Sequence, residues 1–350
     1  MSSPRYSLTA RLTAAIVSIV VFVAVVEAIV RLAGFDPFFQ NRFFVLNRAL
    51  DHPEIFKKDH DLFWRMRPNR TVTSSFFIGR TYHMNELGLH NPTITPKADR
   101  TRIVAMGNSC TFGWGVATEN GYVRRLEDLL GPQYQAINAG VPGYTSLQGK
   151  RFYQSDIRAL MPDIVTILYS FNDHWAAAKE IADKDQRMPS PWLLDIQNGL
   201  GELHTYRLLK KLLLSAVEPS MDSLFDRRSP VYRVGPEDFR ENLHELCRMI
   251  TADGARPILL TSPIPDLATY FPPGHKSNLH AFHEGYNEII RAVAAEGGYG
   301  LVDLARGFEG RPGLFDDPQV DPTHFNDYGH RLVAEMIAAY LTGDSVTGTF

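Results

Sequence analysis

The residues "VAMGNSCTFGWG", from Val104 to Gly115, carry the most informative pattern in the chain. A short apolar run stops at a glycine, a serine follows two residues later, and two more glycines come after it. An apolar run of this kind, bounded by a glycine-rich turn, is typical of a buried strand in a parallel sheet. The turn then lies at the carboxyl end of the strand, where open sheets bind their ligands. Ser109 is the hydroxyl that this turn presents.

Strand-like and helical segments alternate along most of the remaining chain. Four more apolar runs are expected to be strands, at 134–138, 163–170, 256–265 and 299–304. Helical periodicity marks the five segments "YVRRLEDLLG", "LQGKRFYQSDIRAL", "PEDFRENLHELCRMI", "HAFHEGYNEIIRAVAAEGG" and "DYGHRLVAEMIAAYL". The alternation predicts an α/β fold, a three-layer α/β/α sandwich around a five-stranded parallel sheet.

The domain is expected to span residues 99–343, with a tail at 344–350. Between residues 176 and 233 the alternation breaks, which indicates an insert. An insert this long at the strand edge is either a lid or substrate-binding element over the site or a packing excursion. Residues 34–98, rich in aromatic residues, arginine and asparagine, are expected to form a stalk that packs on the domain.

The N-terminal segment reads "LTAAIVSIVVFVAVVEAIV" from Leu12 to Val30, with Glu27 as its single ionisable residue. This length is close to the ~20 apolar residues that a membrane-spanning helix needs. We therefore predict that residues 1–33 form a transmembrane helix, either a signal anchor or a cleaved signal peptide, so that the domain is periplasmic or extracellular. A buried core helix is the alternative, although the segment has no polar face.

Composition excludes some partners. The 350-residue chain has 36 basic and 39 acidic side chains and no basic run, so nucleic acid is not an expected partner. Its 44% hydrophobic content allows a sizeable core. Cys110 and Cys247 match no metal-ligand spacing and are expected to be free buried thiols, with a disulfide as the alternative.

A second motif, "VDPTHFNDYGH", places Asp321 and His324 three residues apart after the last predicted strand. A serine hydroxyl becomes a nucleophile when a base takes its proton and a third group orients that base. We predict that Asp321 holds the Nδ1–H of His324 and that Nε2 faces Ser109 Oγ. The backbone N–H groups of Ser109 and Gly140 and the side-chain amide of Asn172 are the candidate donors to the negative oxygen of a tetrahedral intermediate.

Each of these residues also has a simpler interpretation. Ser109 alone would more often cap the following helix, and Asp321, His324 and His330 would be metal ligands in an alternative arrangement. We expect no metal and no cofactor. The other glycine-rich motifs do not match, because no Gly-Lys-Ser/Thr occurs at this turn and Thr111 replaces the last glycine of a Gly-x-Ser-x-Gly elbow.

Four blocks together resemble the SGNH (GDSL-type) hydrolase superfamily of esterases, lipases and carbohydrate deacetylases. They are "GNSCTFGWGV" with Ser109, "NAGVPGY" with Gly140, "FND" with Asn172, and "DPTH" with Asp321 and His324. The resemblance covers roughly residues 100–342. It implies a five-stranded α/β/α fold, a Ser-His-Asp triad, a three-donor oxyanion hole and no metal, in a membrane-anchored bacterial-type member.

Two positions depart from the family pattern. The usual Gly-Asp-Ser is Gly107-Asn108-Ser109 here, and an asparagine can keep the acceptor role of the aspartate. Ser170 stands where the family has a glycine, two residues before Asn172, and is expected to affect the oxyanion hole or the substrate pocket.

The sequence favours a serine esterase that cleaves a carboxylic ester, such as the O-acetyl groups of a glycan, through an acyl-enzyme. One alternative keeps the same site but passes the acyl group to an exported polysaccharide, as an O-acyltransferase. The other is a non-catalytic envelope or carbohydrate-binding protein with a decayed site, which Asn108 and Ser170 would permit.

Overall fold

The structure is a computed structural model that describes most of the chain, namely residues 7–34, 52–73, 79–177, 180–214, 231–267, 279–318 and 321–344. The predicted tail beyond Asp344 lies outside the described residues. So do residues 215–230 of the predicted insert and residues 35–51 of the predicted stalk.

Five parallel strands form the central sheet, as predicted. They are β5 (Thr101–Gly107), β6 (Tyr134–Gly140), β7 (Ile164–Leu168), β8 (Arg256–Leu260) and β9 (Gly300–Val302). Their order is β6-β5-β7-β8-β9. The first strand therefore lies between the second and the third, and the carboxyl end of β5 is a topological switch point where such sheets form a crevice.

Three strands are shorter than the sequence predicted, including β7, which lacks residues 163, 169 and 170 of its predicted range. β8 ends at Leu260, ahead of Pro263 and Pro265, which have no N–H to donate to a ladder. β9 ends at Val302 because the Asp303 side chain accepts from the Arg306 N–H and caps the next helix.

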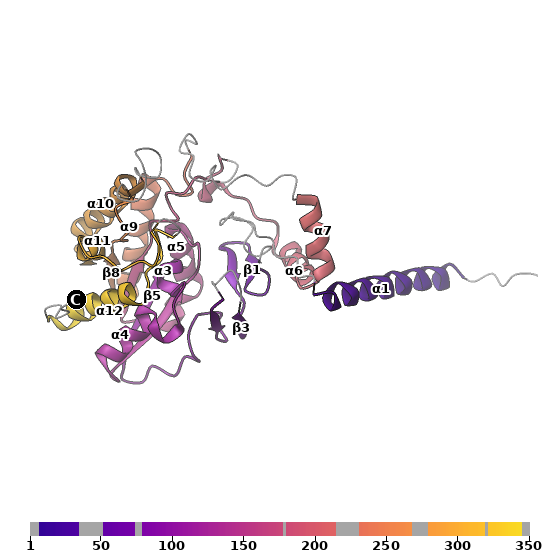
Figure 1. Ribbon diagram of the computed structural model, residues 1–350, viewed down its shortest axis with the longest axis horizontal. Helices are drawn as coiled ribbons and strands as arrows, with labels where there is room; N and C mark the ends of the chain where they lie inside the picture. Colours follow the sequence, from indigo (N-terminus) through magenta and orange to yellow (C-terminus); the bar gives the residue numbers. More distant parts are fainter. Residues whose placement is uncertain are drawn as a thin grey trace, which may run out of the picture.

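Helices cover both faces of the sheet, which makes three layers (Figure 1). One face packs against α5 (Ser146–Ser155), α9 (Pro236–Ala252) and α10 (Leu279–Gly297). The other packs against α4 (Tyr122–Leu130), α11 (Leu304–Phe308) and α12 (Asp327–Thr342). Alternation along β5 explains the division, since Val104 and Met106 belong to the first core and Ile103 and Ala105 to the second. Short 3-10 turns at Thr118–Asn120, Ile157–Leu160 and Asp183–Asp185 complete the described part.

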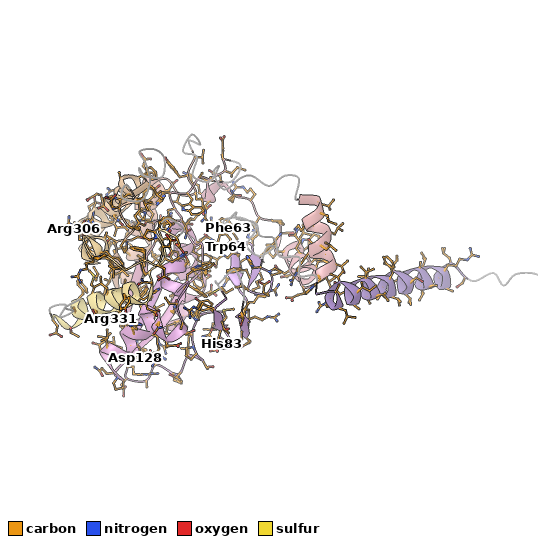
Figure 2. The ribbon with its side chains drawn as sticks, in the orientation of Figure 1. Phe63, Trp64, His83, Asp128, Arg306 and Arg331 are labelled. Atoms are coloured by element: carbon orange, nitrogen blue, oxygen red, sulfur yellow. The ribbon has the colours of Figure 1, made fainter. Side chains whose placement is uncertain are left out.

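The predicted stalk is a pair of hairpins that packs on the domain. β1 (Phe56–Asp59) pairs with β2 (Phe63–Met66), and β3 (Arg70–Thr73) pairs with β4 (Thr81–Met84), both antiparallel. Leu62, Trp64 and Tyr82 are buried in the same hydrophobic core as Val104 of β5. Figure 2 labels Trp64 on the side of the domain where these hairpins lie. Residues 52–73 and 79–98 are therefore part of the folded domain rather than a separate stalk.

The N-terminal apolar segment forms α1 (Leu8–Leu32), which projects from the domain (Figure 1). Its most apolar window of 18 residues has a mean hydropathy of 2.7 and is 6% buried. α1 is long and apolar enough to cross a membrane. It is not a core helix of the described chain, so that alternative is wrong.

The helical part of the insert lies beside α1 and not over the end of β5. α6 (Pro191–Leu200) packs on β1, and α7 (His204–Leu214) contacts α1. Figure 1 shows both helices at the α1 end of the molecule, away from α3 (Ser109–Phe112). For α6 and α7 the structure thus favours the packing alternative over a lid.

Candidate active site

The serine turn is built by Asn108. This residue is the N-cap of α3, and its Oδ1 accepts the Cys110 N–H at 2.9 Å. The expected acceptor role of Asn108 is confirmed. Ser109 is the first residue of the helix and not its cap, so the capping alternative for Ser109 is wrong. Capping by Asn108 leaves the Ser109 hydroxyl available for other partners.

The structure brings Ser109, His324 and Asp321 together, although they come from opposite ends of the domain. His324 Nε2 lies 2.8 Å from Ser109 Oγ, and His324 Nδ1 lies 2.6 Å from Asp321 Oδ2. Asp321 Oδ1 accepts the N–H groups of Thr323 and His324, each at 3.1 Å. One carboxylate oxygen of Asp321 therefore orients the imidazole, and the other fixes the loop by accepting two of its backbone N–H groups.

Electrostatics favour an ionised Asp321. Burial alone would raise the pKa of this carboxyl group, but the charge and hydrogen bonds of His324, with the Thr323 N–H, outweigh burial and lower it. An ionised carboxylate accepts from Nδ1–H, and this tautomer leaves the Nε2 lone pair directed at Ser109 Oγ. The proton positions follow from this bonding pattern.

Trp114 supports the imidazole from the glycine-rich turn. Its ring stacks on that of His324, with centroids 5.2 Å apart and an interplanar angle of 18°. An aromatic face at this distance stabilises a cation. The turn after α3 thus contributes to the histidine as well as to the serine.

His330 does not join the other residues of the metal alternative. It is fully buried on α12, and its Nδ1 accepts the Tyr122 N–H at 3.2 Å. Burial lowers the pKa of His330 to about 3, so its ring is neutral. Among the described residues no group of three His, Cys, Asp or Glu side chains could hold a metal ion. Cys110 and Cys247 are both free and buried, as predicted.

The structure gives Gly140 a packing role. Its N–H donates to Asn138 Oδ1 at 2.9 Å, so it is already occupied. A Cβ at this position would lie 2.2 Å from Phe112 N, which explains why glycine is needed where α3 approaches β6. Gly140 is therefore a poor candidate for an oxyanion donor.

The second glycine of the same block, Gly143, fits the donor role better. It has a φ of 82°, and its N–H donates to no other group in the described part of the chain. Asn172 lies beside this turn, because its Nδ2 donates to Tyr144 O at 3.1 Å and keeps a second N–H. The Ser109 N–H is likewise without a backbone partner among the described residues. Sequence spacing could not separate two glycines three residues apart.

A buried ion pair in the predicted insert holds the Gly143 turn. Arg233 Nη1 donates to Gly143 O at 2.9 Å, and Nη2 donates to Asp183 Oδ2 at 2.9 Å and Gln148 Oε1 at 3.0 Å. The side chains of Arg233 and Asp183 are both 1% exposed. A buried guanidinium with its donors satisfied is rigid, so the turn is fixed in place. No sequence signal pointed to this pair.

The N-terminal hairpins brace the serine turn from the other side. The Tyr82 hydroxyl accepts the Gly115 N–H at 3.0 Å and lies 2.9 Å from Val116 O. His90 Nδ1 lies 2.7 Å from Phe112 O, and burial lowers the pKa of His90 to about 4. A neutral His90 therefore donates Nδ1–H to the end of α3. These positioning residues lie in the segment that the sequence indicated only as a stalk.

Ser170 occupies a strained backbone position. Its φ is 155°, a conformation that glycine adopts with less strain, which accounts for the family's glycine. The side chain is fully buried, and within the described part of the chain Ser170 Oγ has no hydrogen-bond partner.

Asp173 provides a test of the electrostatics next to Asn172. It is fully buried, Oδ1 accepts the Ser146 N–H at 2.8 Å, and Oδ2 has no hydrogen-bond partner among the residues that the structure describes. Burial raises the pKa of Asp173 from 3.8 to about 7. The folded protein thus holds this proton more tightly than the unfolded chain, so stability is lost as the pH rises from about 4 to 7.

We expect the Asp173→Asn substitution to remove this loss of stability at rising pH. The Tm of the variant should fall less than that of the wild type between pH 5 and pH 8. A change of 1 kcal/mol in the free energy of unfolding shifts the Tm of a domain of this size by roughly 2–4 °C. Differential scanning calorimetry across this range measures the divergence, with Asp128→Asn on the surface of α4 as the control. Parallel Tm curves for Asp173→Asn and the wild type would contradict the prediction.

Comparisons with known proteins agree with the fold. A family model described as the GDSL-like Lipase/Acylhydrolase family matches residues 105–332, which is more than half of the chain. The matched family is one of lipases and acylhydrolases, which are ester-cleaving hydrolases. The chain belongs to the GDSL-like lipase/acylhydrolase (SGNH) family.

Individual relatives are more distant. An acetylxylan esterase of Xylanibacter ruminicola is 26% identical over 258 residues, which are 70% of this chain and 44% of that protein. The chain therefore matches less than half of the length of this relative. Among solved structures, an acetylxylan esterase of Geobacillus stearothermophilus, Axe2, is 17% identical with a TM-score of 0.46, covering 73% of this chain and all of Axe2. TesA is 19% identical with a TM-score of 0.45, covering 69% of this chain and 98% of TesA.

Proposed function

We propose that the protein is an esterase, anchored in the membrane by α1, that removes O-acetyl groups from a glycan outside the cytoplasm. The observation that carries the chemistry is the chain of contacts from Ser109 Oγ through the His324 ring to Asp321, at 2.8 and 2.6 Å. The Xylanibacter ruminicola relative is an acetylxylan esterase, which supports an acetylated glycan as the substrate class. The length and apolar character of α1 support the anchor.

In the proposed mechanism Ser109 Oγ attacks the ester carbonyl carbon while His324 Nε2 takes the hydroxyl proton. The Asp321 carboxylate and the Trp114 ring stabilise the imidazolium that forms. The ester C–O bond breaks when His324 returns the proton to the sugar oxygen, which leaves Ser109 acetylated. Water, deprotonated by the same imidazole, then attacks the acetyl group and releases acetate and the free serine.

The tetrahedral intermediates place a negative charge on the former carbonyl oxygen. We propose that it is bound by the N–H of Ser109, the N–H of Gly143 and the Nδ2 of Asn172, since each has an N–H to spare. Fixed donors of this kind stabilise the oxyanion more than water does, because they need no reorganisation during the reaction. Gly143 takes the place that the sequence assigned to Gly140.

Release of acetate from acetylated xylan tests the proposal. We expect the purified chain to liberate acetate from this polymer and to hydrolyse p-nitrophenyl acetate faster than p-nitrophenyl octanoate. The Ser109→Ala variant, prepared in parallel, controls for a contaminating esterase. Hydrolysis of p-nitrophenyl acetate without any release from the glycan would contradict the proposed substrate. Formation of an acetylated acceptor instead of acetate would favour the transferase alternative.

A further inference from the structure

Glu27 is the single acidic residue of α1, and its carboxylate reaches another helix. Its oxygens accept the His204 N–H at 2.9 Å, the Thr205 N–H at 2.8 Å and the Thr205 hydroxyl at 2.7 Å. Arg31, one turn further along α1, donates to the same carboxylate at 2.7 Å. Glu27 therefore caps the N-terminus of α7, where a negative charge meets the positive end of the helix.

This cap fixes α7 within the last two turns of α1. Figure 1 shows that α7 runs across the axis of α1 rather than along it. If α1 is perpendicular to a bilayer, α7 lies parallel to its surface, at the level where the apolar segment of α1 ends.

The neighbouring helix α6 is held to the folded domain. Asn198 Oδ1 accepts the Lys58 N–H of β1 at 2.7 Å, and Asn198 Nδ2 donates to Lys58 O at 3.0 Å. Gln197 Oε1 accepts from Lys58 Nζ at 2.5 Å. With one face attached to β1, α6 presents its other face outward beside α7.

Both helices leave apolar side chains exposed at helical spacing. On α6 the exposed fractions are 65% for Trp192, 51% for Ile196 and 39% for Leu200, each four residues from the next. On α7 they are 56% for Leu209 and 67% for Leu213, again four residues apart. Exposed apolar stripes on two adjacent helices are unusual on a water-soluble surface and mark a contact surface.

We propose that these stripes of α6 and α7 form a docking surface for the lipid bilayer that holds α1. The proposal rests on the proposed role of α1 as an anchor. Any bilayer around α1 must end near Glu27, and Glu27 holds α7 at that level. The side chains of α6 and α7 suit the boundary between headgroups and acyl chains, where leucine and tryptophan insert and lysine faces the headgroups. Lys210 of α7 lies over the Tyr206 ring at 5.4 Å, which completes this amphipathic pattern.

The functional consequence is a fixed orientation of the hydrolase domain. A single spanning helix would let the domain rotate and tilt above the membrane. Helix α6 is attached to β1, and β1 is part of the domain. A second membrane contact through α6 therefore restricts both motions. The site at the end of β5 is then held at a constant distance from the membrane surface.

Fluorescence quenching by lipid tests the docking surface in the full chain. Because Cys110 and Cys247 are buried, a cysteine introduced at Leu209 or Ile196 can be labelled selectively with an environment-sensitive dye. The labelled proteins are reconstituted into vesicles of phosphatidylcholine and phosphatidylglycerol, with and without lipids spin-labelled near the headgroup. Arg306→Cys is the control, since Figure 2 places Arg306 on the side of the domain away from α1. Val20→Cys in α1 reports on insertion of the anchor.

We expect dye at Leu209→Cys and Ile196→Cys to show blue-shifted emission that is quenched by the spin-labelled lipid, and dye at Arg306→Cys to show neither effect. Water-like emission at both positions, with Val20→Cys shielded in the bilayer, would overturn the docking surface and leave the anchor intact. Water-like emission at Val20→Cys would instead refute the anchor. A blue shift without quenching by lipid would show that a protein covers the stripes, and would also overturn the inference.

Discussion

Replacing Ser109 by alanine is expected to lower kcat/KM for p-nitrophenyl acetate by about 10⁶-fold, the loss seen when a nucleophilic serine is removed from a serine–histidine site. The variant lacks the oxygen that lies 2.8 Å from His324 Nε2 and so forms no acyl-enzyme. The buried position accepts a methyl group, because Asn108 and not Ser109 caps α3. The fold should therefore be retained.

Steady-state kinetics and circular dichroism measure these two properties of Ser109→Ala. Labelling by a fluorophosphonate, which needs an activated serine, should disappear with the activity. Ser155→Ala is the matched control, since this serine is exposed at the end of α5 and donates to Arg151 O. An activity of Ser109→Ala close to that of the wild type would exclude Ser109 as the nucleophile.

The next largest effect is expected for Asp321→Asn, which should lower kcat by about 10⁴-fold. The amide keeps the shape of the side chain but offers its N–H₂ to His324 Nδ1, which favours the tautomer with the proton on Nε2. That tautomer cannot accept the proton of Ser109. The loss should appear in kcat rather than in KM, since Asp321 contacts the imidazole and not the substrate.

Asp327→Asn, in the first turn of α12, controls for the loss of a nearby negative charge. We expect its activity to equal that of the wild type. If Asp321→Asn retained full activity at neutral pH, the orientation of His324 would have to come from another group, such as the Trp114 ring.

The central domain was predictable because its signals are local. Each strand of the sheet is a continuous apolar run, and α4, α5, α9, α10 and α12 each carry one apolar face. The spacing of apolar residues and the positions of turn residues were therefore sufficient to predict these elements. Ser109, Asp321 and His324 lie on turns that directly follow strands or precede a helix. Since parallel strands end at one edge of the sheet, the order of the blocks predicted that these residues meet.

The remaining features depend on contacts between distant parts of the chain. Nothing in the sequence links Tyr82 to Val116 or Arg233 to Gly143, because these contacts follow from packing and not from periodicity. The choice between Gly140 and Gly143 rested on which N–H is already bonded, and only the three-dimensional structure gives that. For the same reason the sequence showed Glu27 only as the single ionisable residue of an apolar segment and did not predict that it caps α7.

The contacts of the hairpin residue Tyr82 limit where the chain can be truncated. Its hydroxyl fills the turn after α3, and Trp64 Nε1 donates to Pro142 O at 3.3 Å near the Gly143 turn. A soluble derivative that begins at residue 99 would retain every residue of the four family blocks and lose the side chains that hold two of those blocks in shape. A shortened enzyme therefore has to begin at or before His52, where the described part of the chain resumes after α1.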